Sequence, residues 1–290
     1  MQIRKLIEGS ALPASVEVNK SKLTYSSAPL IMGILNITPD SFSDGGSYSS
    51  PDAAASQAVV MEKSGAHIID IGGESTRPGA GSVSAREQRS RVLPVIEAIR
   101  RRTEVPISID TCIPEVAEAA VNAGAGMINS INAMETPGMI ELAASLGLPV
   151  VLMHMKGIPG TMQNEPFYGD ASQEIAHYLL YRVEALVKAG LPREKILVDP
   201  GIGFGKRQED NIALIHALEW IGIHTGCRVL LGHSRKSFLK GITGIDQADH
   251  RDSVSHIVTV MAEGADVVRV HDVPGTVAAL KLSELLRRTL

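Results

Sequence analysis

Residues 106–155 read PISIDTCIPEVAEAAVNAGAGMINSINAMETPGMIELAASLGLPVVLMHM and repeat one pattern. Three short apolar runs, PISID, MINSIN and PVVLMHM, alternate with longer segments whose apolar residues recur every three or four positions. Near-continuous apolar runs are expected of parallel strands that are covered on both faces. The three-to-four spacing is that of amphipathic helices. This stretch therefore predicts strand–helix units that build a parallel sheet.

The same pattern extends outward in both directions, after a leader of about 28 residues. We predict amphipathic helices at residues 52–64, 84–102, 172–189 and 251–264, with a last helix at 276–288. Glycines in residues 64–66, 123–125 and 263–265 are placed to end a helix before the next strand. The predicted strands are residues 29–36, 67–73, 106–110, 127–132, 149–155, 196–200, 229–234 and 267–271.

Eight such units average about 33 residues each, which is close to the size of a repeat in a closed barrel. We therefore predict an α/β fold: a single-domain (β/α)8 barrel over residues 29–290, with a short N-terminal extension at residues 1–28. A doubly wound parallel sheet is the competing architecture, but an unbroken run of eight units favours closure.

Composition excludes several function classes. The net charge is −4 without a long basic run, and four Phe, one Trp and five Tyr are too few for a base-stacking surface. Two cysteines cannot build a disulfide framework or a four-cysteine zinc site. No apolar stretch has the length of a membrane span, and the first ten residues lack a signal-peptide core. We expect a cytoplasmic globular protein whose partners are neither nucleic acids nor membranes.

Polar residues follow every predicted strand, at the end where barrel enzymes place their active sites. A single Asp or Asn at such a point is commonly a helix cap or a turn residue. Recurrence at all eight strands instead predicts a polar pocket. The residues concerned are Asn36, Glu74 to Arg77, Asp110, Asn129, Asn132, His154, Asp199, Ser234 to Lys236, Arg269 and His271.

The chemistry of these residues is selective. Asp110 and Asp199 can accept hydrogen bonds from a ring with amino and N–H donors, such as an aminopyrimidinone, and Lys236 can donate to ring acceptors. Arg235, Arg269 and His271 add positive charge of the kind that holds phosphate or carboxylate groups. We find no histidine and cysteine spacing of a zinc site and no identifiable Ser-His-Asp arrangement.

Three glycine-rich or turn-rich segments have two interpretations each. GIGFG at residues 201–205 could bind a nucleotide, but it lacks the full dinucleotide pattern, and glycines in a turn beneath a ligand explain it equally well. TPDSFSDGG at residues 38–46 and STRPGAGS at residues 75–82 are either solvent-exposed loops or lids that close over a substrate.

Seven motifs, in order along the chain, resemble the dihydropteroate synthase family. They are NITPDSFSDGG (36–46), DIGGESTRPGA (70–80), SIDT (108–111), LMHMKG (152–157), DPGIGFGK (199–206), SRKSFL (234–239) and RVHDV (269–273). The match runs from about residue 30 to the C-terminus, with one motif at most strand ends. The first and second motifs are long enough to make chance agreement negligible.

This resemblance implies a homodimeric (β/α)8 barrel enzyme of folate biosynthesis that uses Mg2+. Such an enzyme joins 6-hydroxymethyl-7,8-dihydropterin diphosphate to 4-aminobenzoate, giving 7,8-dihydropteroate and pyrophosphate. Because the aryl amine is neutral at pH 7, the reaction demands departure of pyrophosphate and stabilisation of a cation-like methylene more than a strong base. We therefore expect largely dissociative loss of pyrophosphate.

The resemblance also implies a role for individual residues. Asp44, in the first loop, Asp110, Asp199 and Lys236 would be catalytic. Arg269 would stack on the pterin and, with His271 and Asn36, receive the diphosphate, and Asn36 would also contact Mg2+. Thr76, Arg77 and Ser234 would bind 4-aminobenzoate. The residues implied for the pterin diphosphate are Thr76, Asp110, Asn129, Met153, Asp199, Phe204, Gly232, Lys236, Arg269 and His271.

One departure from the family pattern and three rival hypotheses remain. Ser130 stands where the family usually has Asp, and Asn132 is a candidate to compensate.

A methyltetrahydrofolate-binding domain of corrinoid methyltransferases should lack the TPDSFSDGG and SRKSF segments, which are present. A non-catalytic pterin-binding barrel would be favoured if Asn36, Arg269 and His271 were missing, and all three are present. A synthase that tolerates sulfonamides would differ from the family pattern around residues 76–80 or 234–238. These two segments look ordinary for the family, which favours an enzyme that sulfonamides inhibit.

Overall fold

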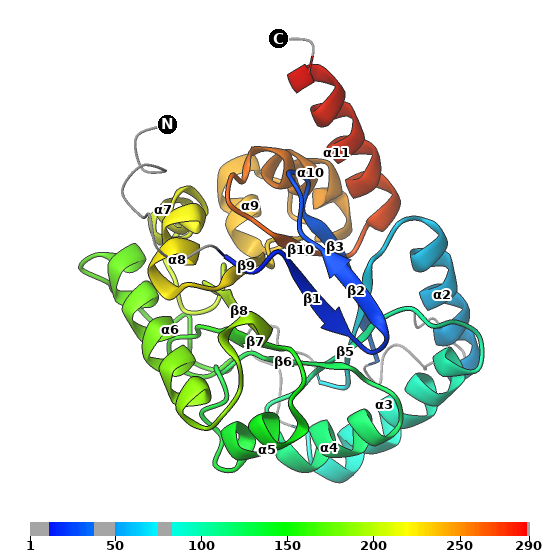
Figure 1. Ribbon diagram of the computed structural model, residues 1–290. Coiled ribbons are helices and arrows are strands. Elements are labelled where there is room, and N and C mark those ends of the chain that lie inside the picture. Colours follow the sequence, from blue (N-terminus) through cyan, green and yellow to red (C-terminus); the bar gives the residue numbers. More distant parts are fainter. Residues whose placement is uncertain (1–11, 38–49, 75–82, 289–290) are drawn as a thin grey trace.

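A computed structural model describes residues 12–37, 50–74 and 83–288 of the chain. Its centre is a closed barrel of eight parallel strands in the order β10-β3-β4-β5-β6-β7-β8-β9 (Figure 1). The strands are β3 (Leu30–Asn36), β4 (Ile68–Gly72), β5 (Ile107–Asp110), β6 (Met127–Ser130), β7 (Val150–Met153), β8 (Ile196–Asp199), β9 (Arg228–Leu231) and β10 (Val267–Val270). All eight predicted strands are thus confirmed to within a few residues, and the doubly wound alternative is wrong.

Helices surround the barrel and bury an apolar layer against it. They are α2 (Pro51–Lys63), α3 (Ala85–Arg100), α4 (Pro114–Asn122), α5 (Met139–Leu146), α6 (Ala171–Lys188), α7 (Gln208–His216), α8 (Leu218–Thr225), α9 (Ser237–Thr243), α10 (Asp252–Met261) and α11 (Val273–Arg288). Side chains such as Ile96 of α3 and Leu179 of α6 are fully buried in this layer. The predicted turn glycines Gly65, Gly124 and Gly264 have φ of 107°, 121° and 86°, which side chains with a Cβ rarely adopt.

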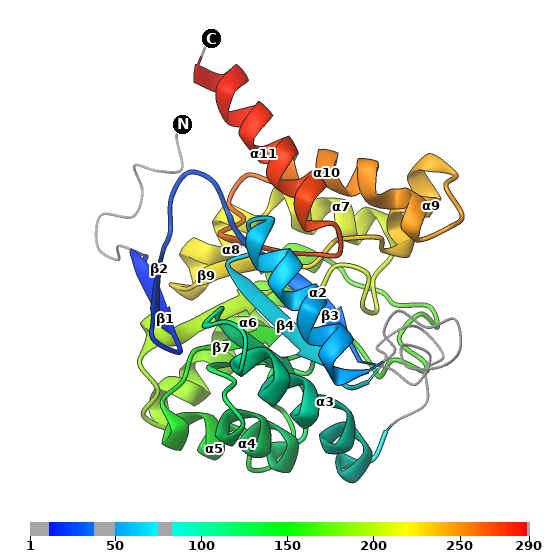
Figure 2. The same cartoon turned by 90° about the vertical axis from the view of Figure 1, so that its right-hand side faces the viewer.

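An antiparallel hairpin closes one end of the barrel. It consists of β1 (Ser15–Val18) and β2 (Ser21–Thr24) and lies in the predicted N-terminal extension. Val16 and Val18 pack with Leu30, Met127 and other apolar side chains at the amino-terminal ends of the strands. Figure 2 shows the hairpin on the opposite side of the molecule from α9, which follows the carboxyl end of β9. This closure leaves the carboxyl ends of the strands as the place for a site.

Strand alternation decides which side chains face that site. Met127, Leu197 and Val267 belong to the apolar cluster inside the barrel. Because successive side chains of a strand point to opposite faces, the residues two positions further along each strand also point inward. At these positions the interior becomes largely polar, because Asp70, Asn129, Asp199 and Arg269 stand there, together with Met153 and Gly232. Asp110 joins them because it pairs in register with Asn129 and Gly72.

Two short 3-10 turns, η2 (Arg193–Lys195) and η3 (Asp249–Arg251), complete the described elements. Among the described residues, no helix combines the length and the apolar character needed to cross a membrane.

Candidate active site

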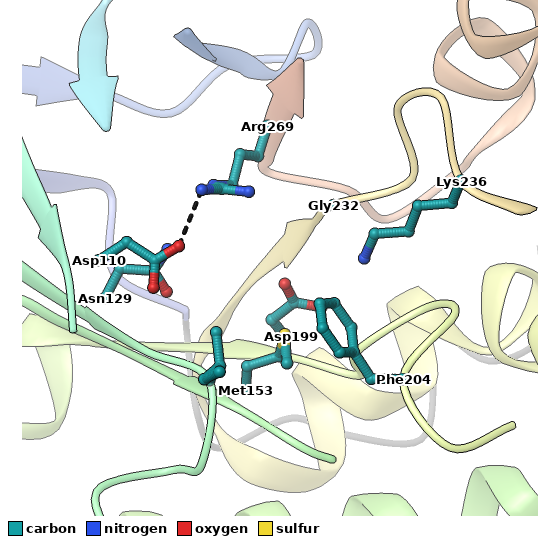
Figure 3. A pocket seen from close by; sticks show the side chains of 9 residues that line it. Asp110, Asn129, Met153, Asp199, Phe204, Gly232, Lys236 and Arg269 are labelled. Atoms are coloured by element: carbon teal, nitrogen blue, oxygen red, sulfur yellow. Dashed lines mark hydrogen bonds and ion pairs between the residues drawn. The ribbon is translucent and has the colours of Figure 1, made fainter. Parts of the chain in front are cut away.

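A small cavity lies at the carboxyl ends of the strands (Figure 3). Residues from five strands, β5, β6, β7, β8 and β10, and from the loops after β6, β8 and β9 converge on it. Eight of its nine lining residues are among those expected from the sequence, and the ninth is Ile131. The lining residues are Asp110, Asn129, Ile131, Met153, Asp199, Phe204, Gly232, Lys236 and Arg269.

One wall of the cavity is a charged network. The Arg269 guanidinium donates from Nη2 to Asp110 at 2.9 Å and from Nε to Asp70 at 2.6 Å. Asp70 also accepts a hydrogen bond from the Asn129 carboxamide at 3.2 Å. Arg269 thereby joins three strands, β10, β4 and β5, and its positive charge is held between two carboxylates.

A second carboxylate stands on the other side of the cavity. Asp199 is 3% exposed and accepts the backbone N–H of Gly201 at 2.7 Å. Gly232 lies directly beside this carboxylate, since a Cβ at this position would be in van der Waals contact with Oδ2 of Asp199 at 3.4 Å. Lys236 donates to the carbonyl oxygen of Ile202 at 2.5 Å, and its Nζ lies 4.2 Å from the centre of the Phe204 ring. Figure 3 shows the Lys236 side chain extending toward Asp199.

The remaining wall is apolar. Met153 and Phe204 form a small buried cluster with Met162, and Ile131 and Met155 pack against it. A flat ring entering the cavity would therefore meet apolar side chains on its face and carboxylates, an amide and an ammonium group at its edges. This arrangement is typical of sites for polar heteroaromatic ligands.

The glycines of GIGFG let the loop after β8 pack closely against the segment after β7. Gly201, Gly203 and Gly205 all have positive φ, at 70°, 81° and 61°. A Cβ on Gly201 or Gly205 would collide with a backbone carbonyl oxygen of the segment after β7. The buried ammonium of Lys206 bonds the carbonyl of Phe204 at 2.9 Å and Nδ1 of His154 at 3.1 Å. The glycines thus hold the ligand-facing turn, and the nucleotide-binding interpretation gains no support from these contacts.

The other predicted site residues either lie at the carboxyl ends of the strands without lining the cavity or fall outside the described residues. Asn36 ends β3 and is exposed, with its Oδ1 close to Gly72. Ser234 and His271 are hydrogen bonded to each other, with 3.0 Å between Oγ and Nδ1. Asp44, Thr76 and Arg77 lie outside the described residues, so their positions stay predictions.

Two further expectations are modified by the structure. Arg235 makes two hydrogen bonds of 2.7 Å to Asp252, so its charge is used to hold the loop after β9 against α10. Ser130 points away from the cavity, as its neighbour Asn129 points inward, and its hydroxyl donates to Asn132 at 2.9 Å. The departure at Ser130 therefore concerns the turn after β6, where Asn132 does contribute.

Burial shifts the protonation equilibria of the cavity residues. Desolvation raises the pKa of Asp110 to about 7 against the opposing effect of Arg269. Desolvation lowers the pKa of Lys236 to about 7, against the opposing effect of Asp199. The pKa of Asp199 is also raised by burial. Both Asp110 and Lys236 therefore change charge near neutral pH.

Sequence reasoning missed Asp70, Ile131 and Lys206. Ile131 is apolar and gives no signal of its own. Asp70 had a signal, because it is a carboxylate in the middle of the otherwise apolar run HIIDIGG. Lys206 closes the DPGIGFGK motif, yet nothing in the sequence says that its ammonium is buried.

Comparisons with known proteins agree on one family. A family model described as pterin binding enzyme matches residues 32–271. A curated relative, the dihydropteroate synthase of Escherichia coli (strain K12), is 45% identical over 259 residues, which cover 89% of this chain and 92% of that protein.

Solved structures give the same result. The dihydropteroate synthase of Yersinia pestis, solved as a sulfonamide drug complex, superposes with a TM-score of 0.88 at 42% identity, covering 94% of this chain and 99% of that one. The dihydropteroate synthase of Burkholderia cenocepacia, complexed with 7,8-dihydropteroate, has a TM-score of 0.85 at 41% identity, covering 97% and 99%.

Proposed function

Because the chain belongs to the dihydropteroate synthase family of pterin-binding enzymes, we propose that it condenses 6-hydroxymethyl-7,8-dihydropterin diphosphate with 4-aminobenzoate. The products are 7,8-dihydropteroate and pyrophosphate, and the reaction is a transferase step of folate synthesis. The observation that carries this proposal is the cavity itself, because eight of its nine lining residues are those that the family resemblance implies for the pterin.

The cavity matches a dihydropterin by chemistry. The ring carries an amino group and N–H groups, which Asp110, Asp199 and the Asn129 oxygen can accept. Lys236 supplies a donor for ring oxygen or nitrogen atoms. Met153 and Phe204 cover the apolar faces of the ring. Buried acceptors that a ligand must satisfy give strong discrimination, because an analogue without the matching donors leaves them unpaired.

Buried carboxylates also suit the bond-breaking step. As the bond between the pterin methylene and the diphosphate oxygen breaks, positive charge develops on the methylene and the ring, and Asp110 and Asp199 are fixed where they stabilise it. The amine nitrogen of 4-aminobenzoate then bonds to the methylene and loses a proton to solvent. A large secondary isotope effect at the methylene would support this dissociative order, and a negligible effect would contradict it.

The diphosphate is assigned to the mouth of the cavity. Arg269 and His271 supply positive charge and N–H donors there. Ser234 Oγ and His271 Nδ1 are hydrogen bonded, which holds the imidazole in a fixed orientation. Ser234 would also face 4-aminobenzoate, together with Thr76 and Arg77, so the two substrates would meet near this hydroxyl.

Magnesium is assigned to Asn36 together with the diphosphate. The described residues contain no cluster of three or more His, Cys, Asp or Glu side chains that could hold a metal ion. An amide oxygen is compatible with Mg2+, which takes oxygen ligands and is completed by several waters and substrate phosphates. When bound, the ion would neutralise charge on the departing pyrophosphate. Asp44, a family-implied catalytic residue, would join from the first loop.

The acid–base properties of the cavity give a pH prediction. A pterin that donates to Asp110 needs the carboxylate, so affinity should fall below about pH 7 as Asp110 takes up a proton. A pterin that accepts from Lys236 needs the ammonium, so affinity should also fall above about pH 7 as Lys236 loses its proton. Titration calorimetry from acid to alkaline pH should show an affinity maximum near pH 7.

Lys236→Ala separates the two limbs. This variant should bind the pterin more weakly by about 1–3 kcal/mol, the cost of a lost charge-assisted hydrogen bond. It should lose the alkaline limb and keep an acid limb that is displaced to higher pH, because the charge of Lys236 lowers the pKa of Asp110. An alkaline limb that survives unchanged in Lys236→Ala would show that another group titrates there.

A homodimer is proposed from an exposed apolar surface on α10 and α11, which lie side by side (Figure 1). Ile257, Met261 and Leu282 are 62%, 70% and 58% exposed. Exposed apolar side chains of this size on neighbouring helices commonly mark an interface. Analytical ultracentrifugation should give twice the mass of the chain, and a monomer at all concentrations would refute the dimer.

Sulfonamide sensitivity is proposed because these drugs mimic 4-aminobenzoate and the segments around residues 76–80 and 234–238 are ordinary for the family. Inhibition that is competitive with 4-aminobenzoate is expected. Failure of a sulfonamide to compete would favour the sulfonamide-tolerant variant instead. Cytoplasmic location stays a prediction, which cell fractionation would test.

The direct test of the proposed function is product formation. The protein, both substrates and Mg2+ should yield 7,8-dihydropteroate, identified by chromatography and mass, and a chelator should suppress the yield. Tight binding of the pterin without product would instead support the non-catalytic pterin-binding barrel.

A further inference from the structure

Asp70 is a buried carboxylate one layer below the cavity. It lies in the middle of β4 and has 0% exposure. Its side chain points into the barrel, because Ile68, two residues earlier on the same strand, packs in the interior cluster. Asp70 is not among the residues that line the cavity. Any effect on a ligand must therefore pass through the residues that Asp70 touches.

Two of those residues do line the cavity. Oδ2 of Asp70 accepts from Nε of Arg269 at 2.6 Å and from Nδ2 of Asn129 at 3.2 Å. Since Arg269 is also bonded to Asp110, its guanidinium plane is fixed at two points by carboxylates of neighbouring strands. The bond to Asn129 commits one amide hydrogen to Asp70. It thereby orients the carboxamide and leaves its Oδ1 available as an acceptor for a ligand.

Stability alone does not explain this residue. Oδ1 of Asp70 has no hydrogen-bond partner among the described residues. A buried carboxylate oxygen without a partner costs free energy, and buried ion pairs are often no more stable than apolar side chains of similar size. Arg269 also has a second carboxylate, Asp110, to balance its charge. The advantage of Asp70 must then lie in the orientation of the groups that it holds.

We propose that Asp70 is a positioning residue for the condensation, holding the Arg269 guanidinium and the Asn129 carboxamide in the orientation that binds the pterin substrate. This inference rests on the proposed function. Asp70 does not touch the substrate, and its influence is confined to the pterin side of the site. It should therefore affect the two substrates unequally.

The test compares Asp70→Asn with a matched control, Ser108→Ala. Ser108 pairs in register with Asp70 on β5, is equally buried, and its Oγ has no partner among the described residues. In Asp70→Asn, the Kd and KM for the dihydropterin diphosphate should rise about tenfold or more, which is the size expected for a weakened charge-assisted contact. The KM for 4-aminobenzoate should stay within about twofold. Ser108→Ala should leave all three constants near those of the unmodified protein.

A pH profile separates positioning from loss of folding. The negative charge of Asp70 helps to raise the pKa of Asp110. Its removal should lower that pKa, so the acid limb of pterin affinity should move to lower pH in Asp70→Asn. A structural defect would reduce the amount of active protein without moving this limb. A cycle with Arg269→Lys should be non-additive, because both variants act on one network.

The outcomes are distinct. Pterin affinity within about twofold of the unmodified protein, with an unmoved acid limb, would overturn the role of Asp70. Additive effects in the cycle with Arg269→Lys would overturn it as well. If the unmodified protein binds no dihydropterin diphosphate, the proposed function itself fails. The NMR signal of the Arg269 Nε–H group then still reports on the contact, since it should shift in Asp70→Asn and stay in place in Ser108→Ala.

Discussion

Asp199→Asn is expected to raise the Kd of the dihydropterin diphosphate by about 10- to 150-fold, corresponding to about 1.5–3 kcal/mol for a hydrogen bond to a charged group. Asn has nearly the same shape as Asp and can still accept the Gly201 N–H, so the loop after β8 should keep its conformation. What it loses is the charge and one acceptor for the N–H donors of the ring. Titration calorimetry and thermal unfolding measure the two effects separately.

Asp266→Asn is the control for this variant. Asp266 is a partly buried carboxylate that bonds Arg228 at 2.8 Å, just before β10 and at the other end of the barrel. Its replacement should lower stability without changing pterin affinity. Equal affinity of Asp199→Asn and the unmodified protein for the pterin would remove Asp199 from the site.

Arg269→Met is expected to produce the largest loss of stability, about 3–5 kcal/mol at neutral to alkaline pH. Methionine fills much of the same volume, but it leaves Asp70 and Asp110 without their common positive partner. Two neighbouring buried carboxylates would then repel each other. Pterin binding should be lost as well, because Arg269 lines the cavity.

Asp110 determines whether the stability deficit of Arg269→Met grows or shrinks as the pH falls. Its folded-state pKa is already raised to about 7, above the value of about 4 for an unfolded chain, so protonation favours the folded state. Losing Arg269 raises that pKa further. The stability deficit of Arg269→Met should therefore shrink as the pH falls from 8 toward 5, which denaturant unfolding at several pH values would measure.

Arg102→Met is the matched control for an arginine in an ion pair. Arg102 bonds Asp52 at the surface, where the two side chains are 37% and 66% exposed. Such pairs contribute about 0–1 kcal/mol, so this variant should unfold almost as the unmodified protein does. An Arg269→Met variant as stable as Arg102→Met at pH 8 would contradict the buried network.

The barrel could be predicted because each of its units is visible locally. The apolar run PISID and the amphipathic segment that follows it predict one strand–helix unit from the local sequence alone. The hairpin β1–β2 could not be found in this way, because SVEV and SKLT contain no continuous apolar run and their burial depends on the barrel end that they cover. The burial of Val16 and Val18 becomes evident only from their packing in one apolar cluster with Leu30.

The site was predictable where the chemistry is carried by strand ends. Asp110, Asn129, Asp199 and Arg269 stand at those ends, and strand alternation then brings them into one cavity. Membership of a hydrogen-bond network cannot be predicted from the sequence in the same way. The bond from Arg269 to Asp70 joins residues 199 positions apart, and only the register of the closed barrel brings them together.

The most direct test of the central claim is release of pyrophosphate from 6-hydroxymethyl-7,8-dihydropterin diphosphate in the presence of Mg2+, with and without 4-aminobenzoate. We predict release that depends on 4-aminobenzoate, with one 7,8-dihydropteroate formed for each pyrophosphate. Binding of the pterin diphosphate with no release in the presence of 4-aminobenzoate would contradict the assignment of a synthase.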